Sequence, residues 1–104
     1  MKFGFFDLGM AEKVRPVLIV STAYGDIDRA LVTVVPHTTS IRGSQYELVV
    51  RVAFLKPGAF LVQNVATYPN VRATRKLGAL KDEEFEVVFS GLLRWLGHTT
   101  HRLL

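Results

Sequence analysis

Residues 15–21 read Arg-Pro-Val-Leu-Ile-Val-Ser, and residues 34–40 read Val-Val-Pro-His-Thr-Thr-Ser. Each segment joins a run of aliphatic, mostly β-branched residues to polar residues at one end, which is typical of a strand buried on both faces. The first segment places an arginine just before a strand, and the second places a histidine, two threonines and a serine just after one. A cation and hydroxyl groups at two strand ends can hold one phosphate group without a metal ion.

Most of the remaining sequence also predicts short strands. Pro36 should end the strand that precedes it, because proline removes a backbone donor. Pro57-Gly58 is a turn signal, and Gly43 can take a positive φ in the loop that follows the threonines. The strands that we expect cover residues 3–7, 17–21, 31–35, 46–52, 59–65 and 71–75, with Gly78 closing the last one.

One helix is expected near the C-terminus, followed by a tail over residues 98–104. Three acidic residues at 82–84 suit the first turn of a helix, Lys81 is a poor N-cap, and Gly97 is well placed as a left-handed terminator. Gly91 inside the helix indicates close packing. The apolar face follows the three-four spacing of Phe85, Val88, Phe89, Leu92 and Leu96. Many short strands closed by one helix predict a mainly β fold, a small partly open barrel.

A chain of 104 residues with 49% hydrophobic and 21% charged residues indicates one globular domain, which we place at residues 1–97. The absence of cysteine excludes a disulfide scaffold and fits a cytoplasmic protein. No apolar run approaches the roughly 20 residues of a membrane span, and the first residues do not resemble a signal peptide.

The charge is unevenly distributed along the chain. Residues 1–81 carry 11 Lys or Arg and 5 Asp or Glu, whereas residues 82–104 carry 2 and 4. A basic body followed by an acidic element favours a polyanionic partner for the body, such as a nucleic acid. A modest basic excess is also common in small proteins that bind no polyanion.

The two opening segments, taken with four others in the same order, resemble the MazF/PemK toxin family. Arg-Pro with its aliphatic run and serine, and Val-Pro-x-Thr-Thr-Ser, are similar to the family's two polar strand ends. Further similarities lie at residues 6–9, 42–47 and 58–65 and in the glycine-led turn and helix of residues 77–97. The first loop is shorter than in the best-known members, and Gln63 stands where some members have an acidic residue.

The resemblance implies an SH3-like barrel of the CcdB/PemK type and the toxin of a toxin–antitoxin module. It also implies a metal-independent, sequence-selective endoribonuclease that needs no cofactor and cleaves single-stranded mRNA by attack of the 2′-hydroxyl, leaving 5′-hydroxyl ends. The implied partners are single-stranded RNA, a cognate antitoxin and a second copy of the chain in a homodimer, without a membrane.

Three residues are candidates for catalysis. Arg15 could hold two phosphate oxygens in fork geometry, or it could merely pair with Glu12 or solvent. Thr38 matches the family's catalytic threonine, and its other reading is a turn that holds the loop together. His37 could act as an acid or base, but neighbouring residues on a strand point to opposite faces, which favours a structural or RNA-contact role.

The candidate RNA-binding residues share polar or cationic side chains near the expected strand ends. Each also has an ordinary structural reading as a turn residue, a strand bridge or a solvated charge. They are Thr39, Ser40, Arg42, Gln63, Asn64, Arg72 and Arg75. No metal site is expected, because His98 and His101 have no carboxylate or cysteine beside them.

Two other functions stay open at the level of sequence. The chain could be a non-enzymatic CcdB-like gyrase poison, for which Trp95 near the helix end is a faint indication. It could also be a catalytically inactive RNA- or protein-binding module of the same fold, because Gln63 removes a candidate general base.

Overall fold

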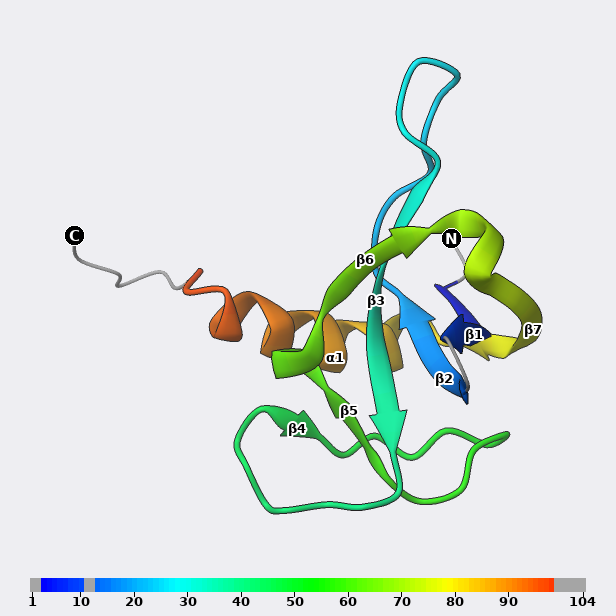
Figure 1. The fold of residues 1–104 in the computed structure, drawn as a ribbon. Helices are drawn as coiled ribbons and strands as arrows, with labels where there is room; N and C mark the ends of the chain where they lie inside the picture. The colour runs from blue at the N-terminus through cyan, green and yellow to red at the C-terminus, as the bar shows by residue number, and fades with distance from the viewer. Residues whose placement is uncertain (1–2, 11–12, 99–104) are drawn as a thin grey trace.

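The computed structural model describes residues 3–10 and 13–98, which form antiparallel strands backed by one C-terminal helix (Figure 1). The strands are β1 (Phe3–Met10), β2 (Lys13–Ile19), β3 (Leu31–Thr38), β4 (Glu47–Leu48), β5 (Ala59–Leu61), β6 (Ala66–Pro69) and β7 (Ala73–Leu80). Two short 3-10 helices, η1 (Val62–Asn64) and η2 (Asn70–Arg72), flank β6, and α1 spans Asp82–Trp95.

The strand order is β4-β5-β3-β2-β1-β7, with β6 also paired to β3, and every pairing is antiparallel. The two outer strands, β4 and β7, are not paired with each other within the described residues, so the barrel stays open. The mainly β fold with one C-terminal helix is therefore as predicted. No helix in the described part of the chain has the length and apolar character to cross a membrane.

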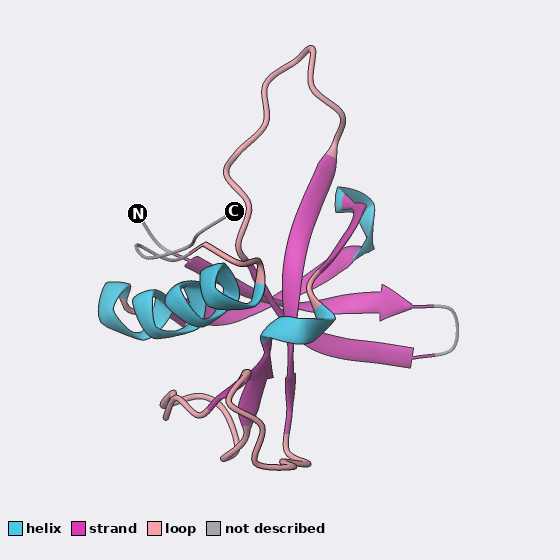
Figure 2. Cartoon of the chain, turned by 90° about the vertical axis from the view of Figure 1, so that its left-hand side faces the viewer, coloured by secondary structure: helices cyan, strands magenta, loops and turns pink. Residues whose placement is uncertain are grey.

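The central strands are buried on both faces, as their aliphatic runs predict. Leu18 and Val35 point to one face, where they join the larger core cluster beneath α1. Val17 and Val34 point to the opposite face and form a smaller cluster with Leu8 and Val32. Figure 2 shows α1 lying along one side of the strands only. The second face therefore has apolar residues without a covering helix.

Helix α1 follows its predicted pattern closely. Phe85, Val88 and Leu92 are buried against the sheet. The side chain of Glu84 accepts a hydrogen bond of 2.7 Å from the backbone N–H of Lys81, which supplies half of a capping box although Lys81 is a poor cap. Gly97 has a φ of 86°, as expected of a left-handed terminator. A Cβ on Gly91 would clash with Leu48, so the predicted close packing is confirmed.

Several predicted strand boundaries were wrong. Strand β2 begins at Lys13, so Arg15 lies inside the strand and not before it. Strand β3 runs through Pro36 to Thr38, because Pro36 lies between the residues that pair with β6 and those that pair with β5. The expected strand 46–52 shortens to Glu47–Leu48.

The last strands also differ from the prediction. The expected strand 59–65 ends at Leu61 and turns into η1, and β6 was not predicted at all. The strand predicted at 71–75 is instead β7, with Gly78 inside it and not beyond it. Gly78 fits there because the ring of Phe54 lies where a Cβ would be. The predicted tail falls almost wholly outside the described residues, which end at His98.

Gly58 supports the strand end that carries the predicted site residues, which makes it the position where a methyl group should cost most. A Cβ there would come within 3.0 Å of the backbone of Thr38 and of the ring of His37. We expect Gly58→Ala to lower the free energy of unfolding by about 2 kcal/mol or more, because backbone atoms cannot move aside as a flexible side chain does. Denaturant unfolding measures this loss.

The matched control is Gly25→Ala, where the added methyl group would meet only a side-chain oxygen of Asp28 at 3.6 Å. Its unfolding free energy should stay within about 0.5 kcal/mol of the parent protein. Equal losses in the two variants would show that the close approach at Gly58 is not what stabilises this strand end.

Candidate functional site

The uncovered face of the sheet carries a hollow of about 280 Å³. Buried Val17 and Val34 lie at its base, and η1 supplies Asn64 at its edge. Its lining residues come from β1, β2, β3, β5, η1 and β6, and they are Leu8, Arg15, Val17, Val34, Pro36, Leu61, Asn64 and Tyr68. A hollow with a mostly apolar lining and one cation at its rim suits a ligand that has both bases and phosphates.

Arg15 lies at this rim because of strand alternation. It is two residues before Val17 on β2, so both side chains point to the same face, Val17 buried and Arg15 exposed. Within the described residues the side chain of Arg15 makes no hydrogen bond or ion pair, and Glu12, its alternative partner, lies outside them. The guanidinium is therefore open to an anionic ligand.

Thr38 lies on the same face of β3 as Val34 and Pro36. Val17 pairs with Pro36, so two further residues along each strand lead to Arg15 and Thr38. The Thr38 Oγ1 accepts a hydrogen bond of 3.0 Å from the backbone N–H of Ser40, which is the turn expected as its structural role. This bond uses an oxygen lone pair, so the hydroxyl hydrogen can still be donated to a phosphate oxygen.

A second hollow, of about 350 Å³, adjoins the first. Leu61 and Asn64 line both hollows, so the two lie on either side of these residues. The second is lined by Ser40, Arg42, Ser44, Tyr46, Glu47, Leu61, Gln63 and Asn64. Four of the predicted RNA-binding residues, Ser40, Arg42, Gln63 and Asn64, therefore lie together although up to 24 positions separate them in the sequence.

Glu47 is the lining residue that sequence reasoning missed. Its carboxylate accepts hydrogen bonds from the backbone N–H groups of Arg42, Gly43 and Ser44, at 2.7 to 3.1 Å. The hydrogen bond from the backbone of Arg42, followed by that from Ser44, holds the pKa of this carboxyl below its ordinary value. A signal was present in the sequence, since Glu47 is the only acidic residue between positions 29 and 81.

His37 does not join this group. Its side chain points to the helix-side core, is only 9% exposed and packs edge-on against Phe60 and Phe5, with ring centroids 4.9 and 6.1 Å away. Burial lowers the pKa of the imidazole. Thr38, the next residue, faces the opposite side. The placement of His37 agrees with the structural role that strand alternation favours.

The remaining predicted residues lie around the hollows or away from them. Thr39 is exposed next to Thr38. Arg72 stacks over the ring of Tyr68, with its guanidinium carbon 5.8 Å from the ring centroid, so it borders the first hollow through that ring. Arg75 lies in neither hollow and bonds the carboxylate of Asp7 at 2.9 Å.

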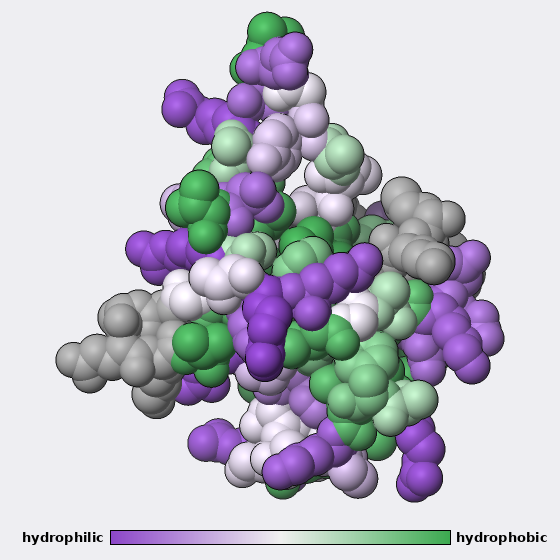
Figure 3. All heavy atoms as spheres, turned by 90° about the vertical axis from the view of Figure 1, so that its right-hand side faces the viewer, coloured by the Kyte–Doolittle hydropathy of each residue, from purple (hydrophilic) through white to green (hydrophobic). Residues whose placement is uncertain are grey.

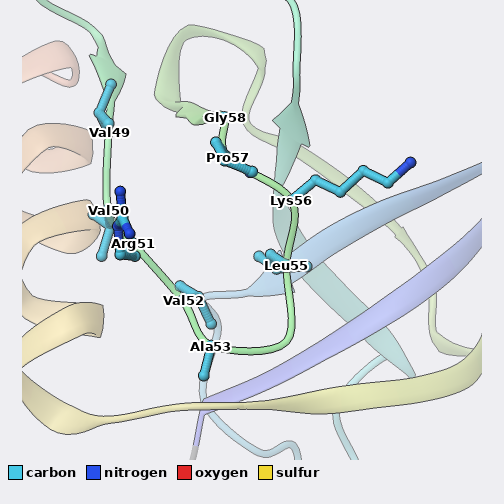
Figure 4. Close-up of a pocket in the computed structure, with 9 residues that line it drawn as sticks. All are labelled: Val49, Val50, Arg51, Val52, Ala53, Leu55, Lys56, Pro57 and Gly58. Atoms are coloured by element: carbon cyan, nitrogen blue, oxygen red, sulfur yellow. The ribbon is translucent and has the colours of Figure 1, made fainter.

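The surface around β1, β2 and β7 carries both hydrophilic and apolar side chains. Figure 3 views the right-hand side of Figure 1 and shows hydrophilic side chains running across its middle between apolar patches. A third hollow, of about 370 Å³, is lined by residues 49–53 and 55–58 (Figure 4). It is mostly aliphatic, Lys56 points away from it, and it contains none of the predicted site residues.

The described residues contain no cluster of three or more histidines and carboxylates that could hold a metal ion. His98 is exposed just beyond α1, and His101 lies outside the described residues.

The buried His37 should make stability depend on pH. Because burial lowers its pKa in the folded state, the unfolded chain takes up a proton first as the pH falls below the ordinary value of about 6.5. We expect the unfolding free energy to fall by up to about 1.4 kcal/mol per pH unit below that value, and this component to be missing in His37→Leu. Denaturant unfolding between pH 7.5 and 5.5 measures both slopes, and identical slopes would contradict the burial effect.

The comparisons with known proteins concern the family and the fold. The family model described as "PemK-like, MazF-like toxin of type II toxin-antitoxin system" matches residues 7–96. A comparison with curated protein sequences gives no significant match.

Among solved structures, an endoribonuclease in complex with its cognate antitoxin from a mycobacterial species is similar with a TM-score of 0.80 and 20% identity, covering 92% of this chain and 93% of that one. The Mycobacterium tuberculosis toxin MazF-mt6 gives 0.77 and 24%, with 92% and 98% covered. A MazE-MazF structure from Deinococcus radiodurans gives 0.75 and 17%, with 94% and 93% covered. At these identities the likeness is one of fold. Because the family model covers most of the sequence, the chain belongs to the PemK-like, MazF-like toxins of type II toxin–antitoxin systems.

Proposed function

We propose that this toxin is a sequence-selective endoribonuclease that cleaves single-stranded mRNA by attack of a ribose 2′-hydroxyl on the adjacent phosphorus. One observation carries the proposal: Arg15, without a protein partner in the described residues, lies at the rim of an apolar hollow on the face of the sheet that also carries Thr38. A similar structure of the same fold supports it, since the mycobacterial protein that was solved with its antitoxin is an endoribonuclease.

The reaction needs charge stabilisation and proton transfer more than an enzyme nucleophile. The O2′–P bond forms as the P–O5′ bond breaks, the 2′-hydroxyl loses a proton, and the departing 5′-oxygen gains one. The products are a cyclic phosphate and a 5′-hydroxyl end. Arg15 would hold the two non-bridging oxygens as negative charge develops on them, and Thr38 would donate a hydrogen bond that fixes the scissile phosphate.

Sequence selection would come from the residues shared by the two hollows. The amides of Gln63 and Asn64 are exposed on η1 and can both donate to and accept from base edges. Tyr68, with Arg72 stacked on it, offers a surface on which a base can stack. Thr39, Ser40 and Arg42 would contact flanking phosphates.

The partners follow from the family and the surface. Two of the similar structures are complexes with an antitoxin, MazE in one of them. An acidic antitoxin segment that covers the hollows and pairs with Arg15 and Arg42 would exclude RNA by competition. Val87 on α1, Trp95 at its last position and Leu96 just beyond it are at least 40% exposed, which favours burial of this apolar surface in a homodimer. We place the protein in the cytoplasm, where its RNA substrate is.

A second candidate, RNA binding without cleavage, is favoured by one observation. Among the described residues Glu47 is the only acidic one that lines either hollow, and its carboxylate is engaged by backbone amides, so it is a poor general base. Gln63 offers no replacement. No observation on the described residues favours the gyrase-poison hypothesis in the same way.

Cleavage of a long single-stranded RNA in excess EDTA, with mapping of the new ends, tests the proposal. We expect discrete cuts with 5′-hydroxyl ends, and a fall in rate of about 100-fold or more in Arg15→Ala and Thr38→Val, because each removes a group that stabilises developing charge. The melting temperatures and the dimer should change little, since both side chains lie outside the core clusters.

Arg29→Ala is the matched control for the loss of a cation. Arg29 is exposed in the β2–β3 connection, which projects from the body (Figure 1), and it lines neither hollow. Its cleavage rate should stay within about threefold of the parent protein. A folded protein that binds RNA and makes no cuts would leave the binding-only function in place of the nuclease.

A further inference from the structure

The loop between β3 and β4 is held in place at its C-terminal end, where Glu47 lies. Glu47 belongs to β4, where it pairs with Leu61 of β5, so its backbone is fixed in the sheet. Its neighbour Tyr46 accepts a hydrogen bond of 3.2 Å from the N–H of Val62 and packs on Trp95 of α1. The segment just before it, residues 39–45, is exposed and has no strand partner. Glu47 is thus a fixed point beside an otherwise unpaired stretch.

The carboxylate of Glu47 reaches back over this stretch and gathers three successive amides. Its Oε1 accepts from Gly43 at 2.7 Å, from Ser44 at 2.8 Å and from Arg42 at 3.0 Å, and Oε2 also accepts from Arg42 at 3.1 Å. Gly43 has a φ of 91°, which lets consecutive N–H groups converge on one anion. Three amides on one carboxylate define the path of the backbone at the residue that carries the Arg42 side chain.

We propose that Glu47 is a positioning residue for RNA binding. By fixing the backbone of residues 42–44 it holds Arg42 at the rim of the second hollow, where a phosphate next to the cleaved one would lie. The inference rests on the proposed function, because it assumes that RNA occupies this hollow. Glu47 acts through the loop and touches no reacting atom, which distinguishes it from the carboxylate that some family members have in place of Gln63.

Charge alone predicts the opposite result, and this makes the inference testable. Removing a negative charge from a surface that binds a polyanion should strengthen binding, since the phosphates lose a repulsive neighbour. If Glu47 instead positions the loop, its removal weakens binding although the net charge becomes more positive. The direction of the change therefore separates the two explanations.

The experiment measures anisotropy of a fluorescein-labelled, mixed-sequence RNA whose riboses carry 2′-O-methyl groups. These groups block the attacking hydroxyl, so binding is read independently of cleavage. We expect Glu47→Ala to weaken binding roughly tenfold and Glu47→Gln roughly threefold, because the amide oxygen of glutamine can still accept from Gly43 and Ser44 but carries no charge. Binding as tight as that of the parent protein, or tighter, in both variants would overturn the inference.

The matched control is Glu86→Gln, which removes the same charge from an exposed position on α1 that lines no hollow. Its binding should be unchanged or slightly tighter. In a background of Arg42→Ala, the effect of Glu47→Ala should largely disappear, since the side chain that it positions is gone. A loss of the same size in both backgrounds would point to general destabilisation and overturn the positioning role.

The parent protein tells the two proposals apart. If it binds the methylated RNA but does not cut unmodified RNA, the nuclease proposal fails, while the Glu47 variants still decide the positioning role. If the parent protein binds neither the methylated nor the unmodified RNA, the nuclease proposal and the positioning role of Glu47 fail together. Should Glu47→Ala not fold at the assay temperature, Glu47→Gln decides alone, with weaker binding in support and equal or tighter binding against.

Discussion

Strand β3 is the element on which the rest of the structure depends, because it is buried on both faces and paired along both edges. On one edge it pairs with β2, and on the other it pairs first with β6 and then with β5. Val34 and Val35 are both at most 2% exposed, on opposite faces. Burial of each such side chain stabilises the fold by about 1.5–3 kcal/mol, and a slip of one residue would exchange the two faces. The alternation that fixes this register also assigns His37 to the core and Thr38 to the surface.

The site exists because β3 changes partner on one edge. Between the β6 pairing, which ends at Val34, and the β5 pairing, which begins at His37, lies Pro36, and the chain on that edge folds into η1 before it reaches β6. A continuous strand there would have filled the space. Instead η1 presents Gln63 and Asn64 at the gap, opposite Arg15 on β2. The proline that was expected to end the strand therefore lies where the irregularity makes room for a ligand.

Patterns that depend on local physics were predictable from the sequence. The apolar face of α1 and its glycine terminator could be predicted, because both follow from helix geometry. The two-sided burial of β2 and β3 followed from their aliphatic runs. Strand β6 was missed because Ala66–Pro69 has neither a clear alternation nor an aliphatic run, and it is held by pairing with β3, which no local pattern encodes.

The prediction of the site from the sequence was limited for the same reason, because it also depends on pairing between distant segments. Arg15 and Thr38 were named from strand ends, but their shared face depends on the β2–β3 register, and the meeting of Arg42 with Gln63 depends on β5 and η1. Glu47 was missed although it is the only carboxylate in a long basic stretch, because a lone acid reads as a solvated charge until its three amide partners are placed.

The structure puts the acidic residues of α1 far from the hollows. Asp82, Glu83 and Glu84 open α1, whereas only its far end, at Trp95, reaches Tyr46, and a helix of 14 residues separates the two ends by about 20 Å. That distance exceeds the screening length of roughly 8 Å at physiological salt, so these carboxylates oppose an approaching phosphate chain little. Among the described residues only Glu47 brings a carboxylate to the hollows, and its charge is partly offset by the three backbone amides that it binds, so Arg15 on β2 and Arg42 in the β3–β4 loop are the cations that RNA would meet there.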